Sequence, residues 1–173
     1  MDATTLRELQ APLKQKYRDD PATATTPLHA RGRGQGDDIT FTVTGWAGDV
    51  RAGLHEATGG DGRDACSGDM LLEALLGCAG VTLRSVATAM GITLEGVTGE
   101  VTGSFDARGT LGVDREASVG VTDVRVVFEA VTDADDERLA KLAQLTERYC
   151  VVAKSLAEAP SIEIRRRGDS SVE

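Results

Sequence analysis

Apolar residues recur every three or four positions in three stretches of the chain, and this spacing predicts three helices. The first is a short amphipathic helix near the N-terminus. Pro12 lies inside it and is expected to kink or restart it. Its apolar positions are Leu6, Leu9, Leu13 and Tyr17. The second runs from Asp69 to Met90, with Ser67 as a candidate N-cap and Gly91 as its stop. The third runs from about Asp133 to Glu158 and opens with acidic residues, which suit the positive end of a helix dipole.

Strands are predicted where apolar and polar residues alternate. Between Leu28 and Leu54, one face of such a strand carries Ile39, Phe41 and Val43. Three glycines precede this strand and predict a hairpin turn that carries Arg31 and Arg33. The Gly- and Asp-rich segment Ala57–Gly68 is predicted to be a loop. Further strands are expected at Thr93–Phe105, Ala117–Glu129 and Ser161–Arg166.

This order of helices and strands predicts an α+β fold. Residues 1–27 are expected to form a helical arm, residues 28–168 one domain and residues 169–173 a flexible acidic tail. The helix around Cys78 is apolar on more than one side, which is typical of a helix buried in a core or between subunits. Aromatic residues make up only 3% of the chain. We therefore expect a second subunit to cover part of this helix, as in a homodimer.

Composition excludes several classes of function. The 173 residues carry a net charge of −9, which argues against a nucleic-acid-binding protein. Neither a secretory signal nor a run of about 18 apolar residues is seen, so the expected location is the cytoplasm and no membrane partner is expected. Two histidines without metal-ligand spacing predict no metal and no cofactor.

The three cysteines are the candidate reactive residues. Cys78 and Cys150 both fall on apolar positions of predicted long helices, so their thiols could meet where these helices pack. Free cysteine is also a common small core residue, and that interpretation stays open for both. Cys66 precedes the second helix in the predicted loop and is interpreted as a half-exposed bystander, or as a resolving thiol if the loop folds back.

Two segments give a specific resemblance. Ser67–Leu83, which reads SGDMLLEALLGCAGVTL, resembles the first cysteine motif of the OsmC/Ohr family, P-x-E-L-L-L-A-A-L-x-G-C. Arg148–Leu156, which reads RYCVVAKSL, resembles the second motif, C-P-V-x-x-x-L. This chain has Ser67 or Gly68 in place of the first proline, and Val151 in place of the second. The resemblance extends over roughly Ile39–Arg166 and implies antiparallel sheets, two long central helices and an intertwined homodimer.

The resemblance also implies a two-cysteine peroxidase for oxidative-stress defence. Cys78 would attack a small organic hydroperoxide and become a sulfenic acid, Cys150 would form a disulfide with it, and an external dithiol would reduce that disulfide. Apolar burial raises a thiol pKa, and a mid-helix position gains little from the helix dipole. A cation is therefore expected beside Cys78. By resemblance it is an arginine held by an acid, with Arg33 and Asp69 as first candidates. Arg31 and Glu73 are the alternatives.

Two other functions stay open at this point. The first is a binding or redox-sensing module on the same fold, in which the cysteines oxidise slowly or have a structural role. The second is a dimeric scaffold in which both thiols fill core space. The missing motif prolines favour the sensing module slightly over the peroxidase.

Overall fold

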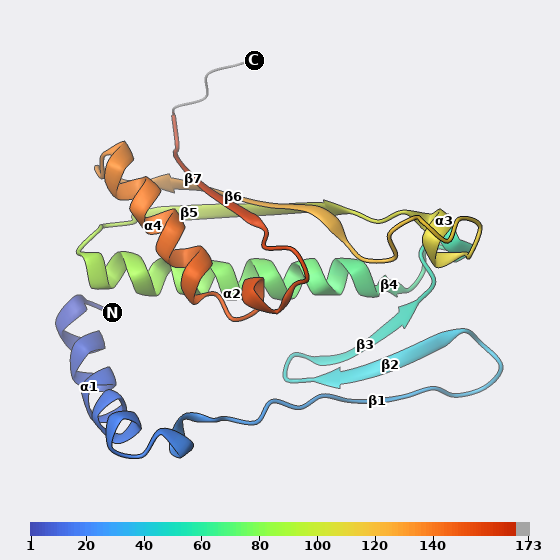
Figure 1. Ribbon diagram of the computed structural model, residues 1–173, viewed down its shortest axis with the longest axis horizontal. Coiled ribbons are helices and arrows are strands. Elements are labelled where there is room, and N and C mark those ends of the chain that lie inside the picture. Colours follow the sequence, from blue (N-terminus) through green and yellow to red (C-terminus); the bar gives the residue numbers. More distant parts are fainter. Residues whose placement is uncertain (169–173) are drawn as a thin grey trace. The chain divides into compact units, whose positions relative to one another are not determined.

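The computed structural model describes residues 1–168, which divide into two units (Figure 1). Unit 1 comprises Met1–Pro27, Leu75–Val101 and the chain from Arg125 onward, and unit 2 comprises Leu28–Ala74 and Thr102–Val124. Both units contain helices and strands, so the predicted α+β class is confirmed. The predicted flexible tail, residues 169–173, lies outside the described residues. The proposed boundaries of arm and domain stay a prediction.

The N-terminal helix α1 spans Ala3–Asp19 and is followed by the short 3-10 helix η1, Pro21–Ala24. It begins at Asp2, whose carboxylate accepts hydrogen bonds from the backbone N–H groups of Thr4 and Thr5 at 2.9 and 2.8 Å. The helix continues through Pro12, so the predicted restart does not occur. None of its residues is buried within the described chain.

Unit 2 holds a four-stranded sheet in the order β1-β2-β3-β4. Its strands are β1 (Arg31–Arg33), β2 (Thr40–Gly45), β3 (Gly48–Gly53) and β4 (Ala65–Cys66). The first three are antiparallel, and β4 runs parallel to β3. The two arginines predicted in a turn therefore lie on a strand, with Arg33 opposite Thr42. A glycine permits this pairing, because a Cβ on Gly32 would lie 2.3 Å from the Phe41 ring.

The segment predicted as the loop Ala57–Gly68 is more ordered than expected. It contains the end of the 3-10 helix η2 (Glu56–Thr58), all of β4 and the first residues of the long helix α2. Cys66 consequently lies on a strand. Unit 2 also contains the short helix α3 (Ala107–Thr110), which the sequence pattern did not predict.

Helix α2 spans Ser67–Met90, so the predicted N-cap Ser67 is already its first residue. It ends at Gly91, which has a φ of 65° and so acts as the expected stop. One stripe of the helix is buried, and it consists of Leu75, Ala79, Leu83 and Ala87. By length and composition alone α2 could cross a membrane, but the core helix of a soluble protein meets the same criterion, so this is weak evidence for a membrane span.

The second sheet has the order β5-β6-β7. Its strands are β5 (Gly96–Ser104), β6 (Thr122–Val131) and β7 (Ser161–Arg166). β6 and β7 run parallel, as β3 and β4 do in the first sheet, so each sheet is mixed and not wholly antiparallel. In unit 1 the side chains of Val126, Phe128 and Ala130 are buried on β6. A Cβ on Gly80 of α2 would lie 3.8 Å from the Phe128 ring, so α2 lies against this sheet.

Helix α4 is shorter than predicted. It spans Asp136–Tyr149, and a separate 3-10 helix, η3, covers Ala153–Ser155. The helix was predicted to be longer because no glycine or proline marks the end of α4 in the sequence. The β-branched valines that follow Cys150 were the weaker signal that it ends there. The Arg138 guanidinium donates hydrogen bonds to the carbonyl oxygens of Met90 and Gly91, each at 3.2 Å. Near its start, α4 is thus tied to the end of α2, and the two helices run in opposite directions (Figure 1).

Candidate thiol site

Cys78 and Cys150 meet within unit 1. Cys78 lies midway along α2 and is half-buried, whereas Cys150 follows the last residue of α4 and is fully buried. The two side chains are hydrogen-bonded to each other, and both are free thiols. The same number of residues separates Met90 from Cys78 as separates Arg138 from Cys150. The contact of Arg138 with Met90 and the contact of Cys150 with Cys78 are therefore equally spaced along the two antiparallel helices.

Four hydrogen-bond donors surround the Cys78 sulfur. Burial raises the pKa of Cys78, but hydrogen bonds from the Val152 N–H, the Cys150 thiol, the Val151 N–H and the Thr82 hydroxyl lower it. The hydrogen bonds outweigh burial, so the pKa of Cys78 lies below its ordinary value. None of these four donors carries a charge.

Cys150 has the opposite electrostatic character. Burial raises the pKa of Cys150, and the hydrogen bond and negative charge of Cys78 raise it further, whereas hydrogen bonds from the Ala153 N–H, at 3.4 Å, and the Val152 N–H lower it. The result is a pKa above the ordinary value. Because the two shifts are opposite, Cys78 loses its proton more readily than Cys150 does.

The backbone after α4 explains why these N–H groups are available. Cys150 still donates its own N–H to the Thr146 carbonyl at 3.0 Å, but its ψ of 109° takes the chain out of the helix. Its carbonyl then accepts from the Lys154 N–H at 3.1 Å, which closes a new turn. Within the described backbone hydrogen bonds, the N–H groups of Val151 and Val152 have no carbonyl acceptor. The Val151 N–H donates to Cys78 instead, and the Val152 N–H is shared between Cys78 and Cys150.

The predicted cation and acid lie in unit 2. The Arg33 guanidinium pairs with the Asp49 carboxylate at 3.0 Å, and Asp49 also accepts from the Thr44 hydroxyl at 2.7 Å. Asp69 and Glu73, at the start of α2, are exposed and form no ion pair with any residue between 1 and 168. The expected Arg33–Asp69 pair is therefore not formed within unit 2. Activation of Cys78 by Arg33 or Arg31 stays a prediction.

Cys66 belongs to a separate cavity in unit 2. The cavity has a volume of about 280 Å³, and its lining includes His55, Cys66, Phe105 and Val121. The rings of His55 and Phe105 meet edge to face, with centroids 5.3 Å apart. Cys66 and Cys78 fall in different units, so a resolving role for Cys66 is untested. No cluster of three or more potential metal ligands occurs within residues 1–168.

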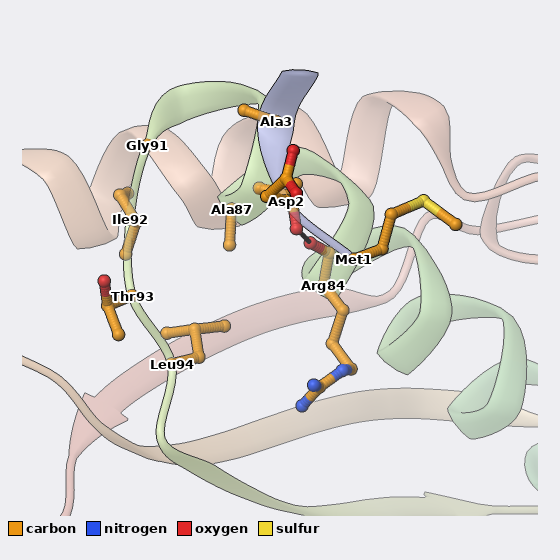
Figure 2. Close-up of a pocket in the computed structure, with 10 residues that line it drawn as sticks. Met1, Asp2, Ala3, Arg84, Ala87, Gly91, Ile92, Thr93 and Leu94 are labelled. Carbon is orange, nitrogen blue, oxygen red and sulfur yellow. Dashed lines mark hydrogen bonds between the residues drawn. The ribbon is translucent and has the colours of Figure 1, made fainter. Parts of the chain in front are cut away.

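A second cavity, of about 340 Å³, lies at the end of α2 beside the N-terminus of the chain (Figure 2). Its lining includes Asp2, Arg84, Thr88 and Leu94. Arg84 and the N-terminal residue Met1 both line this cavity, and Figure 2 shows the Arg84 guanidinium pointing away from Asp2. The Thr88 hydroxyl donates to the Arg84 carbonyl at 2.8 Å, which is ordinary helical bonding. No thiol lines this cavity, so it lacks the nucleophile of the site around Cys78.

Sequence reasoning missed three contributors to the thiol site. Thr82 stands four residues after Cys78 on α2, and this spacing alone places the two side chains on one face of a helix. The N–H groups of Val151 and Val152 had no comparable signal, because their availability depends on where α4 ends. These donors were therefore missed for the same reason that the third helix was predicted to be too long, namely that its end has no signal in the sequence.

The fold and the sequence agree with one family. A sequence model of the OsmC-like protein family matches residues 60–165, whereas a comparison with curated proteins gave no significant match. An OsmC-like protein of Mycoplasma pneumoniae has a TM-score of 0.64 at 16% identity, covering 82% of this chain and 96% of that one. An organic hydroperoxide resistance protein OsmC of Legionella pneumophila gives 0.59 at 14% identity, and OhrB of Bacillus subtilis gives 0.56 at 16%, each covering 82% of this chain and 98% of its own. The match extends over more than half of the sequence, and the chain therefore belongs to the OsmC family.

Proposed function

We propose that the protein is a thiol peroxidase that reduces organic hydroperoxides. The single observation that carries this proposal is the hydrogen-bonded pair of Cys78 and Cys150, whose pKa values move in opposite directions. A low-pKa thiol beside a protonated one is what a nucleophile and its resolving partner require. Similarity to two organic hydroperoxide resistance proteins supports a role in the response to oxidative stress.

The reaction balances with these two thiols and one external dithiol. The Cys78 thiolate attacks the terminal oxygen of the hydroperoxide, so an S–O bond forms and the O–O bond breaks. The products are a sulfenic acid on Cys78 and an alkoxide, which takes up a proton and leaves as the alcohol. Cys150 then attacks the oxidised sulfur, an S–S bond forms, and hydroxide leaves with the thiol proton as water. Two electrons from the dithiol restore both thiols.

An organic substrate fits the surroundings of Cys78 better than hydrogen peroxide does. Val151, whose N–H contacts Cys78, exposes 65% of its surface, and neighbouring Tyr149 exposes 56%. Val81 on α2 exposes 72%. These apolar groups near the nucleophile can bury the alkyl or aryl part of a hydroperoxide, which hydrogen peroxide lacks.

Exposed apolar surface in each unit supports a homodimer. Val81 lies uncovered on α2 in unit 1, and in unit 2 the exposed fractions are 74% for Ile39, 51% for Phe41 and 104% for Trp46. Such residues in number are typical of a surface that another subunit covers. We expect sedimentation at micromolar concentration to show a dimer, and a monomer would contradict this part of the proposal. A cytoplasmic location remains the expectation.

The decisive experiment follows thiols and peroxide together. Reduced protein is mixed with cumene hydroperoxide or with hydrogen peroxide, and free thiols are counted over time. We expect rapid loss of two thiols with cumene hydroperoxide and slower loss with hydrogen peroxide. Cys78→Ser should abolish the reaction, whereas Cys150→Ser should stop it at a sulfenic acid that dimedone traps. Cys66→Ser is the matched control and should react like the unchanged protein.

One observation favours the alternative of a slow redox sensor or binding module. Arg33 is engaged with Asp49, and neither Asp69 nor Glu73 holds it. If a guanidinium beside Cys78 were indispensable, thiol loss would be slow even with an organic substrate. Slow loss that Cys78→Ser does not change would reject both the peroxidase and the sensor and leave a structural scaffold.

A further inference from the structure

We infer that the cavity around Cys66 is a second thiol site, where Cys66 adds to small α,β-unsaturated aldehydes that carry an apolar tail. The lining residues of this cavity belong to unit 2, whereas Cys78 and Cys150 belong to unit 1. The inference does not rest on the proposed function, because the addition consumes no peroxide and needs no second thiol.

The Cys66 sulfur is open to the cavity. Cys66 is a half-buried free thiol, and its sulfur has no hydrogen-bond partner among the residues that the structure describes. Gly68 leaves space beside it, because a Cβ at Gly68 would lie 3.5 Å from the sulfur. A small molecule in the cavity can therefore reach this thiol, which distinguishes it from a cysteine that only fills core space.

The walls of the cavity are mainly apolar. Leu54, Phe105, Val119 and Val121 line it, and its volume is about 280 Å³. Ligand pockets usually measure roughly 300–1,000 Å³, so this cavity suits a molecule at the small end of that range. Alkyl carbon placed against these walls leaves water, which favours binding. The cavity therefore selects a short apolar chain.

His55 places a hydrogen-bond donor at the same cavity. Its Nδ1 accepts from the Ala57 N–H at 3.0 Å, so the proton of the neutral imidazole is on Nε2. The edge-to-face contact with Phe105 holds the ring in place. Within residues 1–168, no acceptor is found for this Nε2–H. A carbonyl oxygen would satisfy it, and an unsaturated aldehyde carries that oxygen close to the carbon that a thiol attacks.

The addition balances without an oxidant. The Cys66 sulfur forms a bond to the β-carbon of the aldehyde, the C=C double bond breaks, and its electron pair moves to give an enolate. The Nε2–H of His55 hydrogen-bonds to the carbonyl oxygen as negative charge develops there. The thiol proton reaches the α-carbon through solvent. The product is a saturated aldehyde joined to Cys66 by a thioether.

The test is adduct formation at Cys66 in the full-length reduced protein. The probe is trans-2-hexenal, and acrolein is the same unsaturated aldehyde without the alkyl tail. Borohydride stops the reaction, mass spectrometry of the Cys66 peptide gives each rate, and N-acetylcysteine gives the intrinsic reactivity of both aldehydes. Relative to N-acetylcysteine, we expect Cys66 to prefer hexenal over acrolein about tenfold, because part of the tail leaves water.

Two valines of unit 2 provide a matched pair of variants. Val119 is 65% exposed and lines the cavity, whereas Val113 is 74% exposed and lies outside it. Val119→Ser should lower the preference for hexenal about threefold, which is the effect of losing part of one apolar wall. Val113→Ser should leave the preference unchanged. Both side chains are exposed, so neither substitution should unfold the protein.

Two further variants test access to the sulfur and the hydrogen-bond donor. Gly68→Ala is favourable for helix α2 but puts a methyl group beside the sulfur, so it should slow both aldehydes at Cys66. His55→Asn keeps an oxygen that can accept from the Ala57 N–H but removes the Nε2–H, and it should slow both aldehydes about tenfold. Methyl iodide has no carbonyl, so its rate at Cys66 should not change in His55→Asn.

Three results would overturn the inference. These are a preference at Cys66 equal to that of N-acetylcysteine, equal effects of Val119→Ser and Val113→Ser, and the absence of any adduct at Cys66. All of these readouts concern Cys66 alone. The proposed peroxidase is judged by thiol loss from Cys78 and Cys150, so either idea can fail without the other.

Discussion

Removing one buried leucine from α4 tests whether helix packing positions the thiol pair. Leu142 is completely buried and lies between the two contacts that tie α4 to α2. Leu142→Ala removes the equivalent of about three methylene groups, worth about 2.4 kcal/mol at about 0.8 kcal/mol each. The cavity left behind adds to this, and buried leucine-to-alanine changes cost roughly 2–5 kcal/mol. We expect the free energy of unfolding to fall by about 3 kcal/mol.

Denaturant unfolding at a fixed protein concentration measures this loss, because the proposed dimer would make stability depend on concentration. Leu9→Ala is the matched control: Leu9 is 56% exposed on α1, and its loss should change stability by less than about 0.5 kcal/mol. Alkylation of Cys78 should also slow in Leu142→Ala, since the turn after α4 is no longer held against the sulfur. A loss below about 1 kcal/mol, or unchanged alkylation, would refute the idea that packing of α4 aligns the two thiols.

Two further predictions concern the second sheet. Hydrogen bonds from Arg165 and Arg125 lower the pKa of Glu163 to about 2. Ionised Glu163 therefore stabilises the folded state fully above its unfolded pKa near about 4.3, and this stabilisation is lost as the pH falls through about 2. Because its side chain is 41% exposed, Glu163→Gln should cost under about 1 kcal/mol at pH 7, and acid unfolding curves should converge with the unchanged protein near pH 2. Gly99→Ala would place a Cβ 2.6 Å from the Phe128 ring, which is 2% exposed and cannot swing away, so thermal unfolding should show a loss of about 1–3 kcal/mol.

Elements with a strong local signal were predictable. Helix α2 followed from its apolar periodicity and its terminal glycine, and the predicted strand Ser161–Arg166 coincides with β7. The family followed from two cysteine motifs far apart in the sequence, because each fixes the identity of several residues at fixed spacing. These features depend on residues close in sequence, and local physics is enough to locate them.

Features that depend on long-range contacts were not predictable. The glycines around Arg31 and Arg33 predict a turn. In the structure, however, Gly32 leaves room for the Phe41 ring of β2, and this allows β1 to pair with β2. The end of α4 likewise has no breaker residue. Helical spacing continues past Cys150 in the sequence, whereas the backbone turns there, and the Val151 N–H bonds to the sulfur of Cys78 on another helix.

The opposite pKa shifts of the two thiols follow from the hydrogen bonds that each sulfur makes. Burial raises the pKa of both cysteines, so burial cannot distinguish them. Each sulfur accepts from two turn N–H groups, Val151 and Val152 for Cys78 and Ala153 and Val152 for Cys150, but Cys78 also accepts from the Thr82 hydroxyl and the Cys150 thiol, whereas Cys150 is the donor to its partner. Transfer of the proton from Cys150 to Cys78 would leave two N–H groups and the Thr82 hydroxyl facing a neutral sulfur. The lower pKa of Cys78 is therefore consistent with its proposed role as the nucleophile, and the Val151 N–H is one of the groups that lower it.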